Sequence, residues 1–480
     1  MSSKLAFGIG ASGEAIYLSL SNAFIVIFYN QVIGLNNALI GTAIMLAMIG
    51  DAISDPLVGI VSDRWRSQLG RRHPFLIAAP LPLALSLYFV FNPPQWLFDL
   101  SSETAIFAWL ATWTIISRSV LTLFNVPHLA LGGELSKDQH ERSQLFSANT
   151  IFGMVSGPGF IFIAYTFFFA DEVVRASDGA VVPGQLAGES YGPLILTACA
   201  VVVVTISACA AGTAKEIKYL SKAQRQENRL TLMAFFGQIV STFNNRNYLV
   251  ILVGYFFFMI ASGIYDTLAI HINTYFWELK PNQIRWFSLV GLGAAAAGAL
   301  LSPLCMQKFD RKPVMLISLA ITTLCAQLVV TLRLFGLMPE NGDPYLLPLL
   351  LLNAAGFTFS IGMGSVAIMS MIGDIVDENE LLCGERQEGL FFSARAFFAK
   401  ASNSVGHFFA GIMLEYYVRL PLQAIPGELS ADTLTRLGVS AGPIMGVAAI
   451  FSLLIYSRYN LSRDRHQEIM GKLRERAATG

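Results

Sequence analysis

The sequence contains little charge. Only 13% of its 480 residues are Asp, Glu, Lys or Arg, and 54% are hydrophobic; the charged share is about half that of an average soluble domain. A soluble chain of this length would form domains with wet, charged surfaces, and so few charges cannot cover them. The 32 basic and 32 acidic residues cancel to a formal net charge of zero, which offers no basic field for nucleic acid. Soluble enzymes and nucleic-acid-binding proteins are therefore disfavoured.

Several other signals are absent. The five cysteines show no CxxC spacing, which argues against a disulfide framework and a zinc site. No Walker A loop, nucleophile elbow or metalloprotease motif is present, so neither ATP-driven transport nor hydrolytic catalysis is supported, and no cofactor is implied. No small-residue cleavage site follows the first apolar stretch, so we expect that stretch to be retained as a membrane span.

Long apolar runs dominate what remains. Twelve runs are each long enough to cross a bilayer as a helix, for which about 20 residues are needed. Barrel strands are ruled out because they are shorter and alternate in polarity. The sequence thus predicts an all-α, multi-pass membrane protein with twelve transmembrane helices. The expected spans are 10–33, 38–62, 74–92, 105–130, 145–169, 191–213, 248–271, 283–306, 314–336, 345–371, 389–414 and 437–457.

Lys and Arg residues predict the orientation and the domains. They concentrate in the segments after the even-numbered spans and in the C-terminal tail, so the positive-inside rule places both termini in the cytoplasm. The longest polar interruption, 214–247, is interpreted as a central cytoplasmic loop. It separates an N-terminal six-helix half, 1–213, from a C-terminal six-helix half, 248–457, and residues 458–480 form a cytoplasmic tail.

The two halves share a weak repeat. Span 2 ends in GIVSDRWRSQLGRRHP and span 8 ends in CMQKFDRKP, so each places Asp-Arg and then a basic-Pro pair at the same membrane edge. Two parallel six-helix halves around a central pathway are a common plan for secondary transporters.

A few ionisable residues lie inside the predicted spans, where they are costly and usually mark a pathway or a partner. They comprise four acids and three bases, so one bound cation or proton would make the set neutral, as a coupling-ion site requires. The acids are Glu14, Asp51, Asp55 and Asp266, and the bases are Arg118, Arg395 and Lys400.

Asp51 and Asp55 form the sharpest pair. Their i, i+4 spacing puts both carboxylates on one helix face, where two negative charges repel strongly. Sharing a proton or binding Na⁺ would relieve this repulsion, with Ser54, Thr122 and Asn125 completing an oxygen shell. Pairing with basic groups is the structural alternative.

The basic residues have two possible roles. A lysine at mid-membrane should pair with a carboxylate, and the span 2 aspartates are natural partners for Lys400. Arg118 either braces neighbouring helices or, like Arg395, offers a fork for a carboxylate, sulfate or phosphate of a substrate.

Four blocks of sequence resemble one transporter family. They are GDAISDPLVGIVSDRWRSQLGRRHPF in span 2, KLAFGIGASGEA at the start, LFNVPHLALGGELS at the end of span 4, and GDIVDENE followed by RQEGLFFSARAFFAK around span 11. The chain is thereby similar to the glycoside–pentoside–hexuronide:cation symporters of the major facilitator superfamily. The resemblance implies the major facilitator fold and cation-coupled import.

The resemblance also assigns residues. It implies a cation site at Asp51, Asp55 and Thr122 and a functional lysine at Lys400. It further implies a cytoplasmic gate, which we expect at Asp63, Arg64, Asp374, Asp377 and Arg386.

Departures from the family bear on the substrate and on the ion. The best-known sugar carriers of the family have an aspartate where this chain has Asn125, so coupling to H⁺ and to Na⁺ both stay open. A sugar-binding aspartate is replaced by Ala15, and a sugar-binding arginine falls near Thr150. Arg118 and Arg395 are additions, which favours an acidic, hexuronide-type solute. The expected substrate site comprises Glu14, Tyr17, Arg118, Asn125, Thr150, Asp266, Arg395 and Asn403.

The sequence therefore predicts a cation-coupled symporter for a sugar-like solute, monomeric and located in a bacterial inner membrane. Its partners would be the solute, the coupling cation and the lipid bilayer. Two alternatives remain open. A lysolipid symporter of the same family would have a similar basic site, and GMVSGPGF in span 5 resembles a motif of proton-driven antiporters that export amphiphiles.

Overall fold

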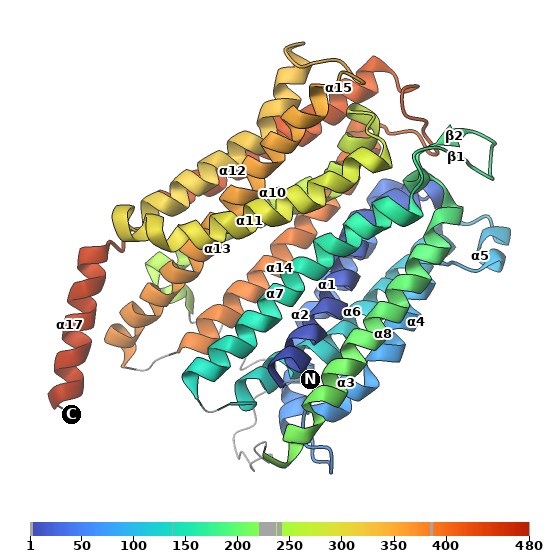
Figure 1. Ribbon diagram of the computed structural model, residues 1–480. Helices are drawn as coiled ribbons and strands as arrows, with labels where there is room; N and C mark the ends of the chain where they lie inside the picture. The colour runs from blue at the N-terminus through green and yellow to red at the C-terminus, as the bar shows by residue number, and fades with distance from the viewer. Residues whose placement is uncertain (1–2, 137, 220–236, 238–241, 385–386, 480) are drawn as a thin grey trace. The chain divides into compact units, whose positions relative to one another are not determined.

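The computed structural model describes residues 3–136, 138–219, 237, 242–384 and 387–479. The N-terminal helices are α1 (Ser3–Ile27) with η1 (Phe28–Ile33), α2 (Asn37–Arg64), α3 (His73–Ala78), α4 (Pro80–Phe91), α5 (Gln95–Asp99), α6 (Glu103–Glu134), α7 (Gln139–Ile163) with η2 (Ala164–Phe168), and α8 (Tyr191–Thr213) (Figure 1). The remaining long helices are α10 (Arg246–His271) with η7 (Ile272–Phe276), α11 (Pro281–Phe309), α12 (Arg311–Leu334), α13 (Leu346–Cys383), α14 (Glu388–Ile412) with η8 (Met413–Val418), α15 (Ala431–Val439), η9 (Ser440–Ile444), α16 (Met445–Tyr456) and α17 (Arg463–Thr479).

Short elements connect the helices. A small antiparallel hairpin of β1 (Val173–Val174) and β2 (Val181–Val182) follows η2, and the 3₁₀ turns are η3 (Gly184–Leu186), η4 (Gly188–Ser190), η5 (Ala214–Tyr219) and η6 (Thr242–Asn244). Side chains cap several helix starts. The Asn36 amide oxygen accepts from the backbone N–H of Ala38 at 2.8 Å, and the Asp138 carboxylate from that of Glu141 at 2.8 Å. Such caps satisfy donors that the first helical turn leaves unpaired.

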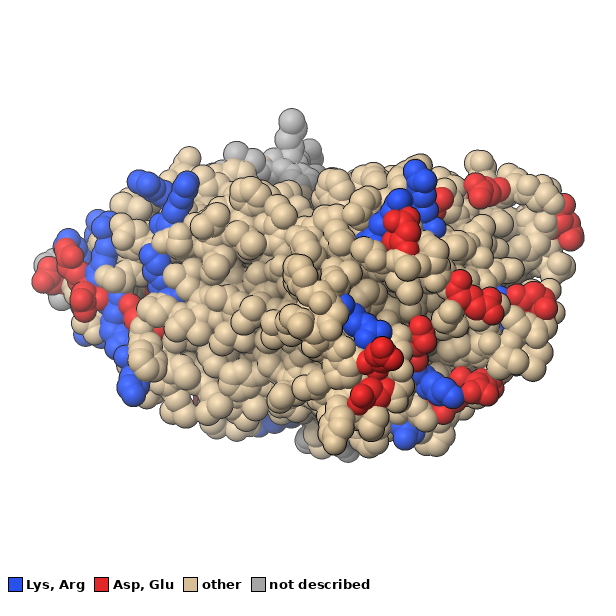
Figure 2. Space-filling view, turned by 90° about the horizontal axis from the view of Figure 1, so that it is seen from above, with Lys and Arg blue, Asp and Glu red and all other residues tan. Residues whose placement is uncertain are grey.

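Eleven helices in the described residues are long and apolar enough to cross a membrane. The twelfth predicted span, 389–414, corresponds to α14, which contains Arg395, Lys400 and His407 and is more polar than those eleven. Large areas of the face drawn in Figure 2 carry no Lys, Arg, Asp or Glu. Outward-facing leucines such as Leu300, 76% exposed, are typical of a surface that contacts lipid. The prediction of an all-helical membrane protein is confirmed.

The chain divides into two compact units. The first comprises Met1–Leu232, Asn273–Leu289 and Phe408–Ser430, and the second Met233–Ile272, Val290–His407 and Ala431–Gly480. In the first unit α1 packs against α7 and α8, and α2 against α6.

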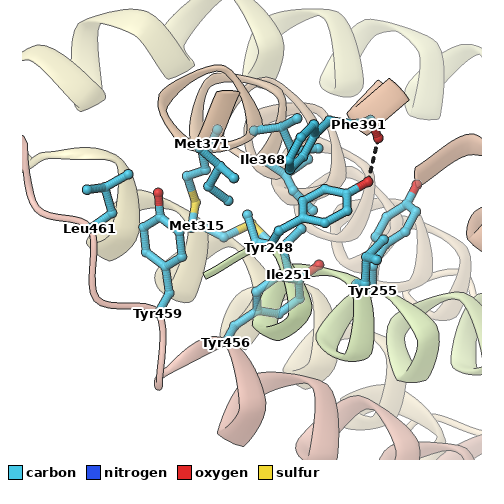
Figure 3. Close-up of a cluster of buried hydrophobic side chains, with 14 of the residues drawn as sticks. Tyr248, Ile251, Tyr255, Met315, Ile368, Met371, Phe391, Tyr456, Tyr459 and Leu461 are labelled. Atoms are coloured by element: carbon cyan, nitrogen blue, oxygen red, sulfur yellow. Dashed lines mark hydrogen bonds between the residues drawn. The ribbon is translucent and has the colours of Figure 1, made fainter. Parts of the chain in front are cut away.

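In the second unit α10 packs against α16, α12 against α13, and α17 against α13. Its core is rich in tyrosine and methionine, and Figure 3 shows Tyr248 turned toward Phe391, whose backbone carbonyl accepts the Tyr248 hydroxyl. This bond fixes the start of α14 against α10.

Candidate functional site

Helices α2 and α6 bring the predicted cation-site residues together. Arg118 Nη1 lies 2.7 Å from Asp51 Oδ2, and the Thr122 hydroxyl donates to Asp55 Oδ1 at 2.8 Å. In each contact the two residues are 67 positions apart in the sequence. A step of four residues along α2 therefore matches a step of four residues along α6, and the two helices run parallel. The repulsion expected between the two aspartates is therefore relieved in part by the Arg118 guanidinium, which here braces α6 against α2, one of the two roles that the sequence left open for it.

A proline adds a backbone group to this region. Pro56 lies inside α2 directly after Asp55. Because proline has no N–H, it cannot donate to the carbonyl of Ala52, four residues earlier. The helix thereby offers a carbonyl oxygen within one turn of the two aspartates. The Ser54 hydroxyl adds another oxygen, 3.4 Å from Thr122 Oγ1.

Helix α1 contributes the next layer. The Asn125 amide on α6 donates to the Glu14 carboxylate, and the hydroxyls of Tyr17 and Ser117 lie 2.5 Å apart. Both contacts join α1 to α6, so Glu14 and Tyr17 of α1 lie beside the polar side chains of α6. Thr150 is different: it is exposed on α7 and donates to the Phe146 carbonyl of its own helix at 2.9 Å.

The second unit has its own polar cluster, which depends on a close approach of α10 and α14. A Cβ on Gly263 would lie 2.2 Å from the Asn403 carbonyl oxygen, and a Cβ on Gly406 would lie 2.3 Å from the Ile260 carbonyl oxygen. Only glycine permits this distance. The contact places Asp266 where its carboxylate accepts hydrogen bonds from the side chains of Asn403 and Ser262.

His407 extends this cluster. Its Nδ1 lies 2.7 Å from the Thr267 hydroxyl, and its Nε2 lies 3.1 Å from the amide oxygen of Asn403. Two predicted substrate-site residues, Asp266 and Asn403, are thus neighbours in the structure. His407 is not among the site residues predicted from the sequence, although it follows Asn403 by one helical turn.

The remaining two bases of the predicted set lie on α14. Arg395 Nη2 donates to the Tyr255 hydroxyl at 2.9 Å, and its guanidinium carbon lies 4.9 Å from the centre of the Tyr255 ring. Lys400 is partly buried, five residues further along the helix.

The predicted gate in the first unit is an ion-pair network. Arg72 contacts Asp63 at 2.5 Å and Glu134 at 2.9 Å, and Arg71 contacts Glu134 at 2.9 Å. Arg72 is almost fully buried, whereas Arg64, the other predicted gate residue here, is exposed. The network ties the loop after α2 to the end of α6.

A second network occupies the corresponding place in the second unit. Arg311 Nη1 lies 3.1 Å from Asp374 Oδ2, and His466 on α17 lies 3.5 Å from Asp374 and 2.9 Å from Asp377. Arg386 lies outside the described residues. Asp374 and Asp377, proposed as gate residues from the sequence, thus share the imidazole of a helix in the C-terminal tail.

The two networks match the repeat seen in the sequence. In each unit an arginine of the basic-Pro loop pairs with an acid near the end of a following helix: Arg72 with Glu134 of α6, and Arg311 with Asp374 of α13. Five members of these networks were not predicted as gate residues from the sequence: Arg71, Arg72, Glu134, Arg311 and His466. Glu134 and Arg311 lie within blocks that the sequence itself highlights, whereas nothing in the sequence pointed to His466.

Long apolar helices with paired carboxylates and bases inside them are typical of secondary transporters. The fold is that of the major facilitator superfamily: the nucleoside transporter NupG aligns with a TM-score of 0.64 at 14% identity, over 95% of this chain and 100% of that chain. A family model described as MFS/sugar transport protein matches residues 6–463. The chain belongs to this family of sugar/cation symporters.

Relatives that are symporters or importers by name match this chain over nearly their whole length. The chain is 23% identical to an uncharacterized symporter, sll1374, of Synechocystis (98% of this chain, 96% of the relative) and 23% identical to the putative glycoside/cation symporter YagG of Escherichia coli (100% and 96%). It is 24% identical to a putative sulfoquinovose importer of Salmonella typhimurium (99% and 93%). The predicted family, the multi-pass membrane location and the assignment as a transporter rather than an enzyme are confirmed.

Proposed function

We propose that this symporter imports an acidic, sugar-like solute together with one cation, H⁺ or Na⁺, that binds beside Asp55. The observation that carries the proposal is the paired arrangement of α2 and α6. Arg118 neutralises Asp51, whereas Asp55 accepts from the neutral hydroxyl of Thr122. The two carboxylates lie one helical turn apart, and a cation bound beside Asp55 and Thr122 would relieve the repulsion between them.

Oxygen atoms around Asp55 suit either ion. Hard cations prefer carboxylate, hydroxyl and carbonyl oxygens, and the Thr122 and Ser54 hydroxyls and the Ala52 carbonyl supply the last two kinds. A proton would instead convert Asp55 to a neutral acid that can still hydrogen-bond to Thr122. The coupling ion is thus chosen by how completely these oxygens enclose it.

Charge balance supplies the coupling. Glu14, Asp51 and Asp55 bring three carboxylates to the first unit's cluster, and Arg118 brings one guanidinium. A cation bound there adds positive charge next to these carboxylates, and this lowers the cost of loading an anionic solute into a site of low dielectric. We further propose that Lys400 changes its contacts when the cation binds, so that the solute and the cation cross the membrane together.

For the solute we propose an anionic group on a sugar-like body. Arg118 already contacts Asp51, so Arg395 is the arginine that we assign to the solute, together with Asp266 and Asn403 for its hydroxyls. One relative is named a putative sulfoquinovose importer, and sulfoquinovose is an anionic sugar. Because other relatives are named a lactose permease and a raffinose carrier, the preference for an acidic solute rests on Arg395 rather than on the relatives' names.

We propose twelve spans in two six-helix halves with both termini cytoplasmic, operating by rocking alternating access. The networks around Arg72 and Arg311 would then form the cytoplasmic gate of each half, opening when the solute leaves. Family membership supports symport over the antiport alternative.

Replacing Asp55 by Asn tests the cation site. We expect Asp55→Asn to abolish concentrative uptake in proteoliposomes while solute exchange down its gradient persists, because the pathway remains but the ion is no longer bound. Asp432→Asn, at an exposed carboxylate of α15, is the matched control and should retain full uptake. Concentrative uptake by Asp55→Asn at the level of the control would refute the proposed site.

The solute class has its own test. Thermal-shift screening of neutral sugars, uronates, sulfosugars and lysolipids, each with Na⁺ or at varied pH, identifies the binding class. We expect the anionic sugars to stabilise the protein and Arg395→Gln to weaken that effect. Stabilisation by lysolipids alone would refute a sugar-like solute and indicate an amphiphile. Efflux of the solute driven by an inward proton gradient would refute symport and indicate antiport.

A further inference from the structure

The second unit contains a cavity that the cation site and the gates do not use. Its volume is about 150 Å³, and α10, α12, α13 and α14 all line it. Most of the wall is apolar, with Phe258, Leu319 and Ile361 among its members. Three more lining residues, Tyr255, Met315 and Ile368, belong to the tyrosine-rich core and are labelled in Figure 3. An apolar cavity of this size holds a molecule of about the size of benzene.

The serine and threonine hydroxyls in the wall already donate to backbone carbonyls of their own helices. Ser318 donates to the Val314 carbonyl at 2.7 Å, and Thr322 donates to the Ser318 carbonyl at 2.9 Å, each within α12. Ser365 on α13 likewise donates to its own helix at 2.8 Å. These hydroxyls therefore offer few donors to an occupant, and the wall behaves as an apolar surface.

Arg395 is the exception in this wall. Its Nε is buried and has no hydrogen-bond acceptor, and no carboxylate in the described part of the chain lies within 4.0 Å of its guanidinium. By contrast, Arg118 in the first unit is neutralised by Asp51 at 2.7 Å. A guanidinium inside a membrane span is expensive unless an anion compensates it. The cavity thus combines an apolar wall with a guanidinium that contacts Tyr255 but has no carboxylate partner among the described residues.

We propose that this cavity binds a small organic anion, namely a carboxylate attached to an apolar group of about six or seven carbons. The carboxylate would accept from Arg395 Nε, and the apolar group would lie between Phe258 and Leu319. A bare sugar fits less well, because its many hydroxyls would lose water against apolar walls without gaining partners. The site lies within the second unit and shares Arg395 with the proposed solute site, so it rests on that part of the proposed function. It goes further because the apolar cavity would admit a small organic anion that competes with the solute for Arg395.

Benzoate, benzyl alcohol and acetate separate the two features of the site. Calorimetric titration into the full-length protein in nanodiscs should show saturable binding of benzoate and weaker binding of the other two. Benzyl alcohol lacks the anion, and acetate lacks the apolar group. Arg395→Gln should weaken benzoate binding by about tenfold or more, because a hydrogen bond between charged groups is lost, and should leave benzyl alcohol binding unchanged.

Matched variants control for non-specific effects. Ser365 is an exposed member of the wall, so Ser365→Phe should block the cavity without unfolding the helix. Met369→Phe adds the same ring one turn further along α13, outside the wall, and should bind benzoate normally. Arg436→Gln removes a positive charge from exposed α15 and should also bind normally.

Two results would overturn the proposal. One is equal benzoate affinity in the wild type, Arg395→Gln and Ser365→Phe, which would indicate partition into lipid. The other is the absence of saturable benzoate binding by folded wild-type protein. Asp55→Asn should retain benzoate binding, so a failure of this site and a failure of the proposed coupling are measured separately.

Discussion

Removing Arg118 tests whether an ion pair inside the membrane joins α2 to α6. Arg118→Gln leaves the charge of Asp51 without its neutralising guanidinium, in a place where the two side chains are only 5% and 11% exposed. Breaking a buried pair by removing one partner costs about 3–5 kcal/mol, because the other charge stays desolvated. Asp51→Asn should be destabilising for the same reason.

The double variant separates this effect from packing. In Asp51→Asn/Arg118→Gln both charges are gone and the two amides can bond to each other. We therefore expect the double variant to be more stable than Arg118→Gln alone. A coupling free energy of about 1–3 kcal/mol is expected for residues in direct contact.

Thermal unfolding of the four proteins in nanodiscs at neutral pH measures this coupling. A parallel cycle at Asp432 and Arg436, an exposed i, i+4 pair at 2.9 Å, should give only about 0.3–0.5 kcal/mol. If the Asp51–Arg118 cycle is additive, or no larger than this control cycle, the pair does not join the helices and our account of the site fails.

Three further outcomes follow from particular contacts. Gly263→Ala and Gly263→Val should both reduce transport, and Val should abolish it, because any Cβ there would lie 2.2 Å from the Asn403 carbonyl oxygen. Uptake and folded yield of both variants are compared with the wild type. His466→Gln should increase hydrogen exchange in α17 but not in α15, because it removes the imidazole that contacts the carboxylates of Asp374 and Asp377 on α13. The Arg175 guanidinium lowers the pKa of Asp178 to about 2, so the stability from this pair is present above the unfolded pKa near 4 and is lost as pH falls toward 2. Pepsin should therefore cut the β1–β2 hairpin of the wild type at pH 2 but not at pH 4. Asp178→Asn lacks the ion pair and should be cut at pH 4 as well. Equal cutting of the wild type at both pH values would contradict this explanation.

Much of the fold follows from the sequence because membrane helices leave strong local signals. Apolar runs coincide with helices throughout, although α1 begins at Ser3 rather than near residue 10 and the span predicted at 437–457 is divided by η9 at Pro443. The tail predicted as 458–480 contains α17, and the β1–β2 hairpin was not anticipated. These elements are short or polar, and their stability comes from contacts with distant residues rather than from hydrophobic periodicity.

The candidate site was predictable as a set of residues but not as a set of pairs. Spacing alone placed Asp51 with Asp55, and Arg118 with Thr122, on single helix faces. It did not show that Arg118 would contact Asp51, or that Thr150 would be exposed on α7 and bonded to its own helix. Helical periodicity fixes which side chains share a face, but the rotation of one helix against another depends on packing along their whole length.

The sequence by itself determined a multi-pass helical membrane protein, its family, and the few charged residues inside its spans, because the low charge content and the long apolar runs admit no soluble fold. Only the tertiary structure decided which of those charges are neutralised. Arg118 and Arg395 look alike in the sequence, yet one lies 2.7 Å from a carboxylate and the other lines an apolar cavity with its Nε lacking an acceptor. Charge compensation depends on distances of a few ångströms between different helices, and only packing sets those distances.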